Sequence, residues 1–494
     1  MARDTADLVL RGGRVLDPET GLDGVRDVVV RDGRIAEITD PAHPAGADHR
    51  PPVNRALDVT GLVVAPGFID LHSHLRRPTE LLLQVMDGVT TALDLEAGSA
   101  PVARDYERAA QAGLPVNYGY SASWALHRMR AAGLDISAGP QTFFTHIGNP
   151  AWQTQATPGG RAALLDGLAA EIADGALGIG ILLGYAPGSS RLEFQDVHQL
   201  AAELSVPTFT HARGISDPDA AYDGAAEIVA TSLANGTHAH LCHINSTSQR
   251  TLDRVHRLLA KAVASGVRVT TEAYPYGSGS TGLGSVILDP DNLAGMGLRS
   301  SSVLVLATGE RPATDGRLRE LRRQDPAALA IIDFLDLSDP DDEALIQRAM
   351  LFHDTAIASD AMPLVGPVDG WPVAETTPTH PRTAGTFCRA ISWLSRGLGA
   401  LSLLEVVARA TLRPAQILAE VAPAMAAKGR VQVGADADLV VFDPGTVADR
   451  ADYAAPARPS VGMRHVLVGG TFVVRDGVAD PEARPGRPIR GVRR

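Results

Sequence analysis

Histidines and carboxylates stand where several short apolar runs of this sequence end, and these residue types bind metal ions. The first run ends in the segment Asp70-Leu71-His72-Ser73-His74. Because side chains alternate along a strand, His72 and His74 point the same way and form a natural chelating pair. Imidazole nitrogens and carboxylate oxygens together form the ligand set of a Zn²⁺-type centre. The same residue types end four further runs, at Glu96, His211, His243 and Asp360.

The apolar runs alternate with helical stretches, which predicts a parallel (β/α)₈ barrel of the TIM type. Catalytic residues in such barrels lie at the C-terminal ends of the strands. Helical stretches are expected at 160–174, 196–204, 219–234 and 252–264. The eight expected strands are 63–74, 89–96, 115–120, 176–183, 207–211, 238–243, 268–274 and 355–360. The stretch from about 286 to 352 exceeds a normal connection and indicates an insertion near the mouth of the active site.

Both ends of the chain carry short strands instead. Asp32-Gly33 and Gly469-Gly470 separate apolar runs, a strong signal for hairpin turns. Short strands cannot bury a core alone, so we expect the two ends to pack together. The predicted organisation is a small β-sandwich from residues 1–62 and 425–494, flanking a barrel domain from residues 63–424.

Composition excludes several classes of partner. The 494 residues carry 45 Lys plus Arg against 57 Asp plus Glu, a net charge of −12. This acidic balance argues against nucleic acid as a partner, and no apolar run is long enough to span a membrane. The two cysteines, Cys242 and Cys388, exclude a disulfide framework and favour a cytoplasmic location. We therefore expect a small-molecule substrate, and the sequence allows a homo-oligomer.

The sixth expected strand contains rival histidines. His238 and His240 share one facing, and His243 has the opposite facing. We expect only one of these sets to look into the barrel. The position of His243 at the strand end favours it as the metal ligand, and Cys242 then becomes a buried thiol.

The segment Val64-Ala-Pro-Gly-Phe-Ile-Asp-Leu-His-Ser-His74 resembles the opening signature of the amidohydrolase superfamily. The segments 6–17 and 434–443 fit that resemblance, so it covers nearly the whole chain. It implies a metal-dependent hydrolase with a β-sandwich at the termini. By this resemblance His72, His74 and Asp360 hold one metal ion, and His211 and His243 hold the other.

One feature of many superfamily members is missing. They bridge two metal ions with a carboxylated lysine on strand four, but the expected strand here, 176–183, has no lysine. Glu96 is therefore the expected bridging or second-site ligand, with Asp94 as a weaker rival of the same facing. The expected cofactor is Zn²⁺, as one ion or two, and another divalent metal suits the same ligands.

Within the superfamily, the chain is most similar to the N-acyl-D-amino-acid deacylases. The segments 175–188, 274–281 and 380–387 carry this likeness. It implies that Tyr274 and Ser280 hold a carboxylate of the substrate. Two departures stand out: those enzymes have a cysteine where this chain has Glu96, and a lysine where it has Asn245. The likeness implies hydrolysis of a linear C–N amide bond in an N-acyl amino acid.

Three arginines are candidates for binding the substrate carboxylate. Arg213 lies two residues past His211, and a guanidinium there could clamp a carboxylate in bidentate fashion. Arg382 has the same status. The segment 70–78 also resembles the dihydroorotase opening, in which the arginine after the histidine pair, here Arg76, binds a carboxylate.

Alternative functions follow from these resemblances. The dihydroorotase likeness makes a cyclic amide hydrolase the second candidate, although such enzymes rely on the missing lysine. A deaminase-like enzyme or a non-catalytic binding protein is the third.

The expected mechanism assigns a proton carrier. A bound Zn²⁺ lowers the pKa of its water to about 7, which supplies hydroxide to attack the amide carbonyl. Asp360 lies beside the metal and would act as general base, then as general acid toward the departing nitrogen.

Overall fold

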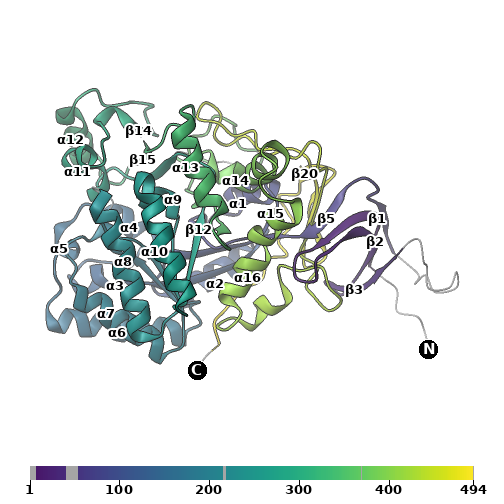
Figure 1. The fold of residues 1–494 in the computed structure, drawn as a ribbon, viewed down its shortest axis with the longest axis horizontal. Helices are drawn as coiled ribbons and strands as arrows, with labels where there is room; N and C mark the ends of the chain where they lie inside the picture. Colours follow the sequence, from purple (N-terminus) through teal and green to yellow (C-terminus); the bar gives the residue numbers. More distant parts are fainter. Residues whose placement is uncertain (1–6, 41–53, 215–217, 369, 493–494) are drawn as a thin grey trace.

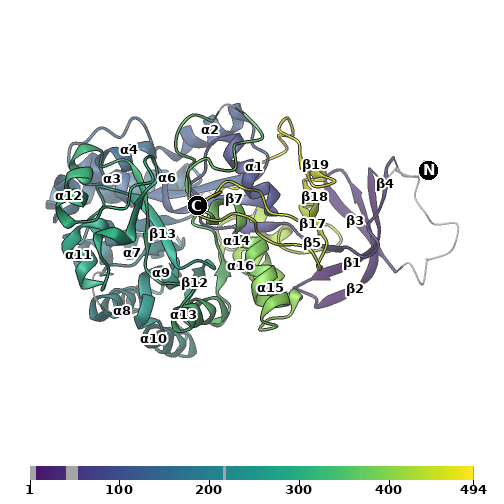
Figure 2. The same cartoon turned by 90° about the horizontal axis from the view of Figure 1, so that it is seen from above.

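The computed structural model describes residues 7–40, 54–214, 218–368 and 370–492. A barrel of strands and helices occupies one side of the molecule, and a sheet built from both ends of the chain occupies the other (Figures 1 and 2). The barrel brings the expected metal ligands together, and the sheet holds the segment that enters its first strand.

Strands from both ends of the chain form one sheet, in the order β20-β19-β18-β17-β5-β1-β2-β3, with β4 paired to β1. The predicted hairpins are present, joining β2 to β3 and β18 to β19. The sheet curls on itself, since Ala437 N donates to Gly33 O at 2.8 Å and Leu10 and Leu467 share one buried core. The predicted sandwich is thus one continuous curled sheet. Its strands are β1 (Leu8–Asp17), β2 (Leu22–Arg31), β3 (Arg34–Thr39), β4 (Ala56–Asp58), β5 (Val63–Pro66), β17 (Leu439–Phe442), β18 (Met463–Val468), β19 (Thr471–Arg475) and β20 (Val478–Ala479).

The predicted parallel barrel is confirmed. Within the described residues, eight strands follow one another in chain order, each parallel to the next. Ser73 and Ala361 form an isolated parallel bridge that connects the last strand to the first. The strands are β6 (Phe68–Asp70), β7 (Val89–Ser99), β8 (Asn117–Ser123), β9 (Ile179–Leu182), β10 (Thr208–His211), β11 (Ala239–Leu241), β12 (Val269–Ala273) and β16 (Ala356–Ile357).

Amphipathic helices cover the outside of the barrel (Figure 1). In α10, the buried residues Leu252, Val255, Leu259 and Ala262 recur every three or four positions, so one face packs inward. The four helices expected from the sequence correspond to α6 (Pro158–Ala173), α7 (Arg191–Glu203), α8 (Pro218–Asn235) and α10 (Leu252–Ala264). The others around the barrel include α1 (Pro78–Met86), α2 (Val102–Ala112), α3 (Trp124–Ala131), α4 (Gln141–His146), α9 (Ile244–Ser248), α13 (Pro340–Leu351), α14 (Arg382–Ala390), α15 (Leu403–Ala410) and α16 (Leu412–Leu418).

The first expected strand, 63–74, is in fact two strands. β5 pairs with β1 and β17 in the terminal sheet, whereas β6 pairs with β7 in the barrel. The chain passes between them at Gly67, where a Cβ atom would lie 2.2 Å from Thr90 Oγ1. A side chain would clash there, so glycine allows one segment to serve both sheets. The division of the chain at residues 62 and 425 stays a prediction, and β5 lies just beyond the first boundary.

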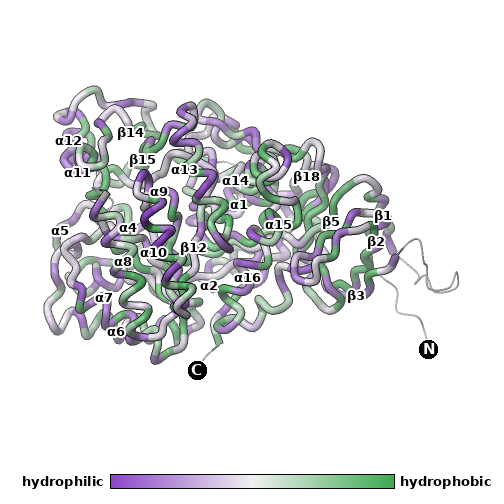
Figure 3. The backbone as a smooth tube through the Cα atoms, viewed as in Figure 1, coloured by the Kyte–Doolittle hydropathy of each residue, from purple (hydrophilic) through white to green (hydrophobic). Residues whose placement is uncertain are grey.

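The expected insertion forms a small sheet with its own helices, at the upper left of Figure 1. The sheet has the order β13-β15-β14, and its first strand begins before the expected start at 286. The helix α13 packs against α9 and β12, so it belongs to the barrel wall. The inserted elements are β13 (Ser278–Gly282), α11 (Pro290–Gly295), β14 (Val303–Val305), α12 (Asp315–Gln324) and β15 (Leu329–Asp333). Figure 3 draws α12 mainly in the hydrophilic colour, as a surface helix requires.

Two further expectations concern the cysteines and the membrane. Cys242 and Cys388 are both buried and free. Among the residues that the structure describes, no helix combines the length and the apolar character that crossing a bilayer demands.

The close approach at Gly67 predicts a stability defect. Gly67→Ala forces a methyl group against Thr90, and overpacking of this kind costs about 1–3 kcal/mol. We expect urea unfolding, followed by circular dichroism, to show a lower free energy of unfolding. Gly159→Ala is the control, because a Cβ atom there meets nothing within 4 Å at the start of α6. Equal stability of Gly67→Ala and the parent protein would contradict this account.

Candidate metal centre and active site

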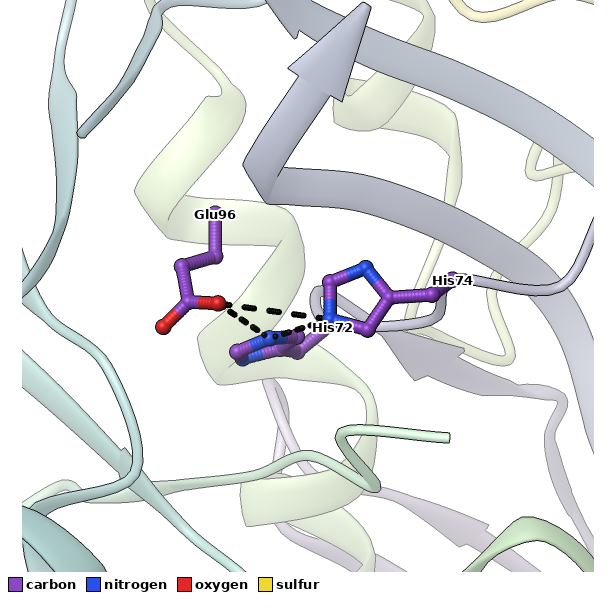
Figure 4. A group of neighbouring side chains, drawn as sticks. All are labelled: His72, His74 and Glu96. Atoms are coloured by element: carbon purple, nitrogen blue, oxygen red, sulfur yellow. Dashed lines mark hydrogen bonds and ion pairs between the residues drawn. The ribbon is translucent and has the colours of Figure 1, made fainter. Parts of the chain in front are cut away.

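The expected ligand residues meet at the C-terminal ends of the barrel strands. His72 and His74 follow β6, Glu96 lies in β7 and His211 ends β10. Figure 4 shows the side chains of His72, His74 and Glu96 turned toward one another. Five of the six residues are buried and His74 is nearly so; the set is His72, His74, Glu96, His211, His243 and Asp360.

Two carboxylates behind the first histidine pair decide which ring nitrogens face the site. His72 Nδ1 lies 2.5 Å from Glu272 Oε1, and His74 Nδ1 lies 3.2 Å from Asp94 Oδ1. When the Nδ1–H groups of the neutral rings donate hydrogen bonds to these carboxylates, lone pairs remain on both Nε2 atoms. The two Nε2 atoms are only 3.1 Å apart. Two facing lone pairs repel at this distance, so the pair requires a proton or a cation between its nitrogens.

Glu96 stands between two pairs of histidines. Its Oε2 atom lies 3.2 Å from His72 Nε2 and 4.0 Å from His74 Nε2. Its Oε1 atom lies 3.0 Å from His211 Nδ1 and 2.7 Å from His243 Nε2. Within the described residues, the ion-pair partners of this carboxylate are all histidines. Each oxygen faces a different pair, as a carboxylate between two cations would.

Asp360 completes the first group and contacts a buried arginine. Its Oδ1 atom lies 3.4 Å from Nε2 of both His72 and His74. Its Oδ2 atom lies 2.8 Å from Arg382 Nη2, and the Arg382 side chain is fully buried. Asp360 also has a φ of 51°, a left-handed conformation that non-glycine residues adopt at a cost. The fold therefore positions this carboxylate between the histidines and a fixed positive charge.

His243 reaches the site through a change of backbone conformation. β11 ends at Leu241, and His243 has the left-handed angles φ 31° and ψ 62°. The alternation of side chains applies only within the strand, which ends before His243. His243 and His240 can therefore both face inward. His240 Nε2 lies 3.1 Å from Glu272 Oε2. The prediction that only one histidine set looks into the barrel is therefore wrong.

Mutual electrostatics hold the buried groups in charged forms. Burial lowers the pKa of His74, but the carboxylates of Asp94 and Asp360 together outweigh burial and raise this pKa to about 9. Burial raises the pKa of Glu96, yet the surrounding imidazoles, His72 first, hold it well below its usual range. For Asp360, burial raises the pKa, but the Arg382 guanidinium and the neighbouring imidazoles together outweigh burial, so the net pKa is lowered. The carboxylates stay ionised, and the positive charge facing them can be protons or a bound cation.

The donor atoms fit zinc. Zinc holds nitrogen and oxygen ligands at about 2.0–2.2 Å, so neighbouring donors of a tetrahedral centre lie about 3.3–3.5 Å apart. The 3.1 Å and 3.4 Å separations among His72, His74 and Asp360 match this spacing. The donor atoms lie within 4.8 Å of one another in four groups of described residues, and three of these groups consist of the expected ligands alone. These three groups are His72–His74–Glu96, His72–His243–Asp360 and Glu96–His211–His243, enough donors for one ion or two.

A cavity of about 490 Å³ opens onto these residues. Its size lies within the range of about 300–1,000 Å³ that is typical of small-molecule sites. The insertion contributes a large part of the wall, including residues of β13 and β15 and the two residues Ile287 and Met296 on either side of α11. The inserted sheet thus covers the barrel mouth over the candidate metal centre.

The two hydroxyl residues expected to bind a carboxylate both line the cavity. Ser280 lies in β13, and its shielded Oγ atom has no hydrogen-bond partner within the described residues. A Cβ atom on Gly279 would stand 3.5 Å from the Tyr274 hydroxyl, so this hydroxyl lies against β13 next to the residue before Ser280. Buried hydroxyls almost always have partners, so this oxygen is available for a ligand.

Arg76 lines the cavity, but its charge is already engaged. Its Nη2 atom donates a short hydrogen bond to Asp94 Oδ2, and the guanidinium lies 4.2 Å from the ring centre of Tyr120. Because Asp94 in turn contacts His74, Arg76 supports the histidine pair. Asp94, the weaker rival to Glu96, is thus a residue that orients His74 and lies outside the three donor groups.

The other two expected arginines do not line the cavity in the described part of the chain. Arg382 lies behind Asp360. Arg213 Nε donates to Glu227 Oε2 at 2.9 Å, and its Nη1 donates to the carbonyl oxygen of Pro187 at 2.9 Å. Arg213 therefore ties together loops near the barrel mouth, and we do not retain it as a substrate contact.

Sequence reasoning missed Glu272. This residue of β12 contacts His72 Nδ1 with one oxygen and His240 Nε2 with the other, and its side chain is buried. It stands two positions before Tyr274, so strand alternation gives both residues the same facing. That spacing was the available signal for a carboxylate inside the barrel.

Comparison with known proteins agrees with this site. The sequence profile of the amidohydrolase family matches residues 123–474. The chain belongs to the amidohydrolase family. N-acyl-D-glutamate deacylase from Alcaligenes xylosoxydans xylosoxydans is 30% identical over 527 residues, covering 99% of this amidohydrolase and 97% of that enzyme. D-aminoacylase from the same organism is 29% identical, covering 94% of each chain.

A solved structure shares the fold of this amidohydrolase along its whole length. It is N-acyl-D-glutamate deacylase from Bordetella bronchiseptica, in complex with zinc and a phosphonate inhibitor. The sequences are 26% identical, the TM-score is 0.77, and the match covers 99% of this chain and 100% of the other. Dihydroorotase from Anaeromyxobacter sp. (strain K) is 49% identical, but over only 71 residues, or 14% of this amidohydrolase.

The contact between Glu272 and His72 predicts weaker metal binding in a variant. Glu272→Gln keeps the shape of the side chain but removes the charge that fixes the His72 ring. Losing such a partner of a ligating histidine costs about 10–100-fold in metal affinity or activity. Titration against a competing zinc chelator measures the affinity.

Glu227→Gln is the matched control, because it removes a carboxylate that contacts Arg213 and no candidate ligand. Its zinc affinity should equal that of the parent protein. Zinc affinity unchanged in Glu272→Gln would refute the orienting role.

Proposed function

We propose that this amidohydrolase cleaves the linear amide bond of an N-acyl-D-amino acid with the help of zinc. The observation that carries the proposal is Glu96, whose two oxygens face His72 and His74 on one side and His211 and His243 on the other. The nearly full-length likeness to deacylases of N-acyl-D-amino acids supports the substrate class. Water and the amide yield a carboxylic acid and a free amino acid.

The six ligand residues divide between two positions in this proposal. His72, His74 and Asp360 would hold one ion and His211 and His243 the other, and the Glu96 carboxylate stands between these two sets of residues. When bound, such an ion polarises an amide carbonyl and lowers the pKa of a water molecule to about 7. The remaining chemistry belongs to the side chains around the cavity.

Asp360 is the proposed proton carrier. One of its oxygens lies 3.4 Å from the two histidine Nε2 atoms, and Asp360 lines the cavity. It takes a proton from the attacking water and delivers it to the departing nitrogen, as general base and then general acid. Arg382 contacts the other oxygen at 2.8 Å, which orients the carboxylate for both transfers.

Tyr274 and Ser280 are the proposed partners of the substrate carboxylate. Both line the cavity, and Ser280 has a hydroxyl oxygen without a partner within the described residues. Arg76 contributes by fixing Asp94, and through it the His74 ring. The cytoplasmic location expected from the cysteine content is part of the same proposal.

The cyclic amide alternative gains no support from the site. β9 contains no lysine that could be carboxylated. The dihydroorotase likeness covers only 71 residues, or 14% of the chain.

Metal removal should abolish the proposed activity. Zinc-loaded protein should release amine from N-acetyl-D-amino acids, and chelator-treated protein should not until zinc is restored. Zinc should also raise the melting temperature, because a ligand that binds only the folded state stabilises it. Amine release is measured on paired D and L substrates. Release that survives complete removal of the metal would contradict the proposal.

Asp360→Asn tests the proton carrier. The amide keeps the shape of the side chain, so we expect zinc content to stay close to that of the parent protein. Loss of general acid–base catalysis costs about 10²–10⁴-fold, so kcat should fall by about 10² or more. Steady-state kinetics with parallel zinc analysis measure both quantities. Full activity in this variant would remove Asp360 from the mechanism.

A further inference from the structure

One side of the cavity is lined by apolar side chains, and we call it the apolar chamber. Two of its residues come from α4, which follows β8 and α3, and the others come from the insertion. The chamber consists of Phe143, Phe144, Ile287, Met296, Ile332 and Phe334.

Among the described residues that line the cavity, both arginines are already paired with carboxylates. Arg76 contacts Asp94, and Arg77 Nη2 donates to Glu80 Oε1 at 2.6 Å. Neither belongs to the apolar chamber. The chamber therefore offers no cation to a negatively charged group, and burying a carboxylate without a partner is strongly unfavourable.

Asn245 does not replace this missing charge. Its Nδ2 atom donates to the carbonyl oxygens of Tyr274 at 3.2 Å and Tyr276 at 3.3 Å, and its Oδ1 atom accepts from Tyr274 N at 3.4 Å. The side chain is buried. Asn245 thus holds the backbone around Tyr274, and its side chain is not among those that line the cavity in the described residues.

The apolar chamber begins directly beside the Tyr274 hydroxyl. A Cβ atom on Gly279 would stand 3.5 Å from the Tyr274 hydroxyl and 3.8 Å from both Ile332 Cγ2 and Phe334 Cε1. In an amino acid, the carboxylate and the side chain are attached to the same carbon atom. A substrate whose carboxylate contacts Tyr274 and Ser280 therefore places its side chain against Ile332 and Phe334.

We infer that this amidohydrolase is selective for N-acyl amino acids with a neutral, apolar side chain and discriminates against glutamate and aspartate. This selectivity rests on the proposed function, and it differs from the substrate named for the relative N-acyl-D-glutamate deacylase. Apolar side chains gain by leaving water for the chamber, whereas a carboxylate must give up its hydration there without a partner.

The first test is a substrate panel with zinc-loaded protein. N-acetyl-D-leucine, N-acetyl-D-methionine and N-acetyl-D-phenylalanine should exceed N-acetyl-D-glutamate and N-acetyl-D-aspartate in kcat/KM by at least 100-fold. N-acetyl-D-glutamine separates charge from shape and should rank between the two groups. Acidic substrates that match or exceed the apolar ones would overturn the selectivity while the proposed function stood.

A charge placed in the chamber should shift the preference. Met296→Lys adds an ammonium group to the wall beside Gln249, whose Nε2 atom lies 3.7 Å from Met296 Sδ. We expect it to raise kcat/KM for N-acetyl-D-glutamate at least tenfold relative to N-acetyl-D-leucine. Leu298→Lys is the matched control, because Leu298 is partly buried in the same segment and does not line the cavity. An equal shift in both variants would overturn the assignment of the chamber.

Binding separates selectivity from turnover. If none of the N-acyl amino acids is hydrolysed, the proposed function fails. Calorimetric titration of the same compounds into zinc-loaded protein still decides the inference, because apolar compounds should bind at least tenfold more tightly than acidic ones. Similar affinities, or tighter binding of the acidic compounds, would overturn it.

Discussion

The buried carboxylate of Glu96 must face four imidazole rings at once, and much of the barrel is arranged to meet that condition. The rings come from three different strand ends, so no local segment can assemble them. Behind the rings stands a second layer of carboxylates, Glu272 and Asp94. Arginines compensate the carboxylates in turn, Arg76 at Asp94 and Arg382 at Asp360. From Glu96 outward, negatively charged carboxylates thus alternate with imidazole rings and guanidinium groups. This pairing offsets the cost of burying so many ionisable groups.

The sequence was sufficient to predict the barrel, because strands and helices alternate and five of the eight expected strands end in residues that can bind a metal ion. The sequence was a poorer guide to the structure where the backbone departs from regular strand geometry. Strand alternation could not place His243, because the strand ends before it and the residue takes a left-handed conformation. The break at Gly67 was hidden inside a continuous apolar run, since it depends on the contact with Thr90 from another strand.

Partners brought from distant segments were also beyond the reach of the sequence. Arg76 and Arg213 follow strand ends and Arg382 begins α14, and each contacts a different carboxylate. Arg213 meets Glu227, Arg382 meets Asp360, and Arg76 meets Asp94. An arginine is expected to pair with a carboxylate, but only the tertiary packing decides which carboxylate becomes its partner. Glu272 was missed for the same reason. The role of a single carboxylate within a strand becomes visible only through the histidines that it contacts.

The position of β5 between β1 and β17 has a consequence for how the chain folds during synthesis. β5 leads through Gly67 directly into β6 and the first histidine pair, whereas β17 lies near the other end of the chain. One edge of β5 therefore stays unpaired until almost the whole protein has been synthesised. Pairings between distant segments form slowly, and unpaired strand edges in unfinished chains invite association with other chains. Nascent chains that lack the last strands would carry this exposed edge next to the segment that anchors the active site.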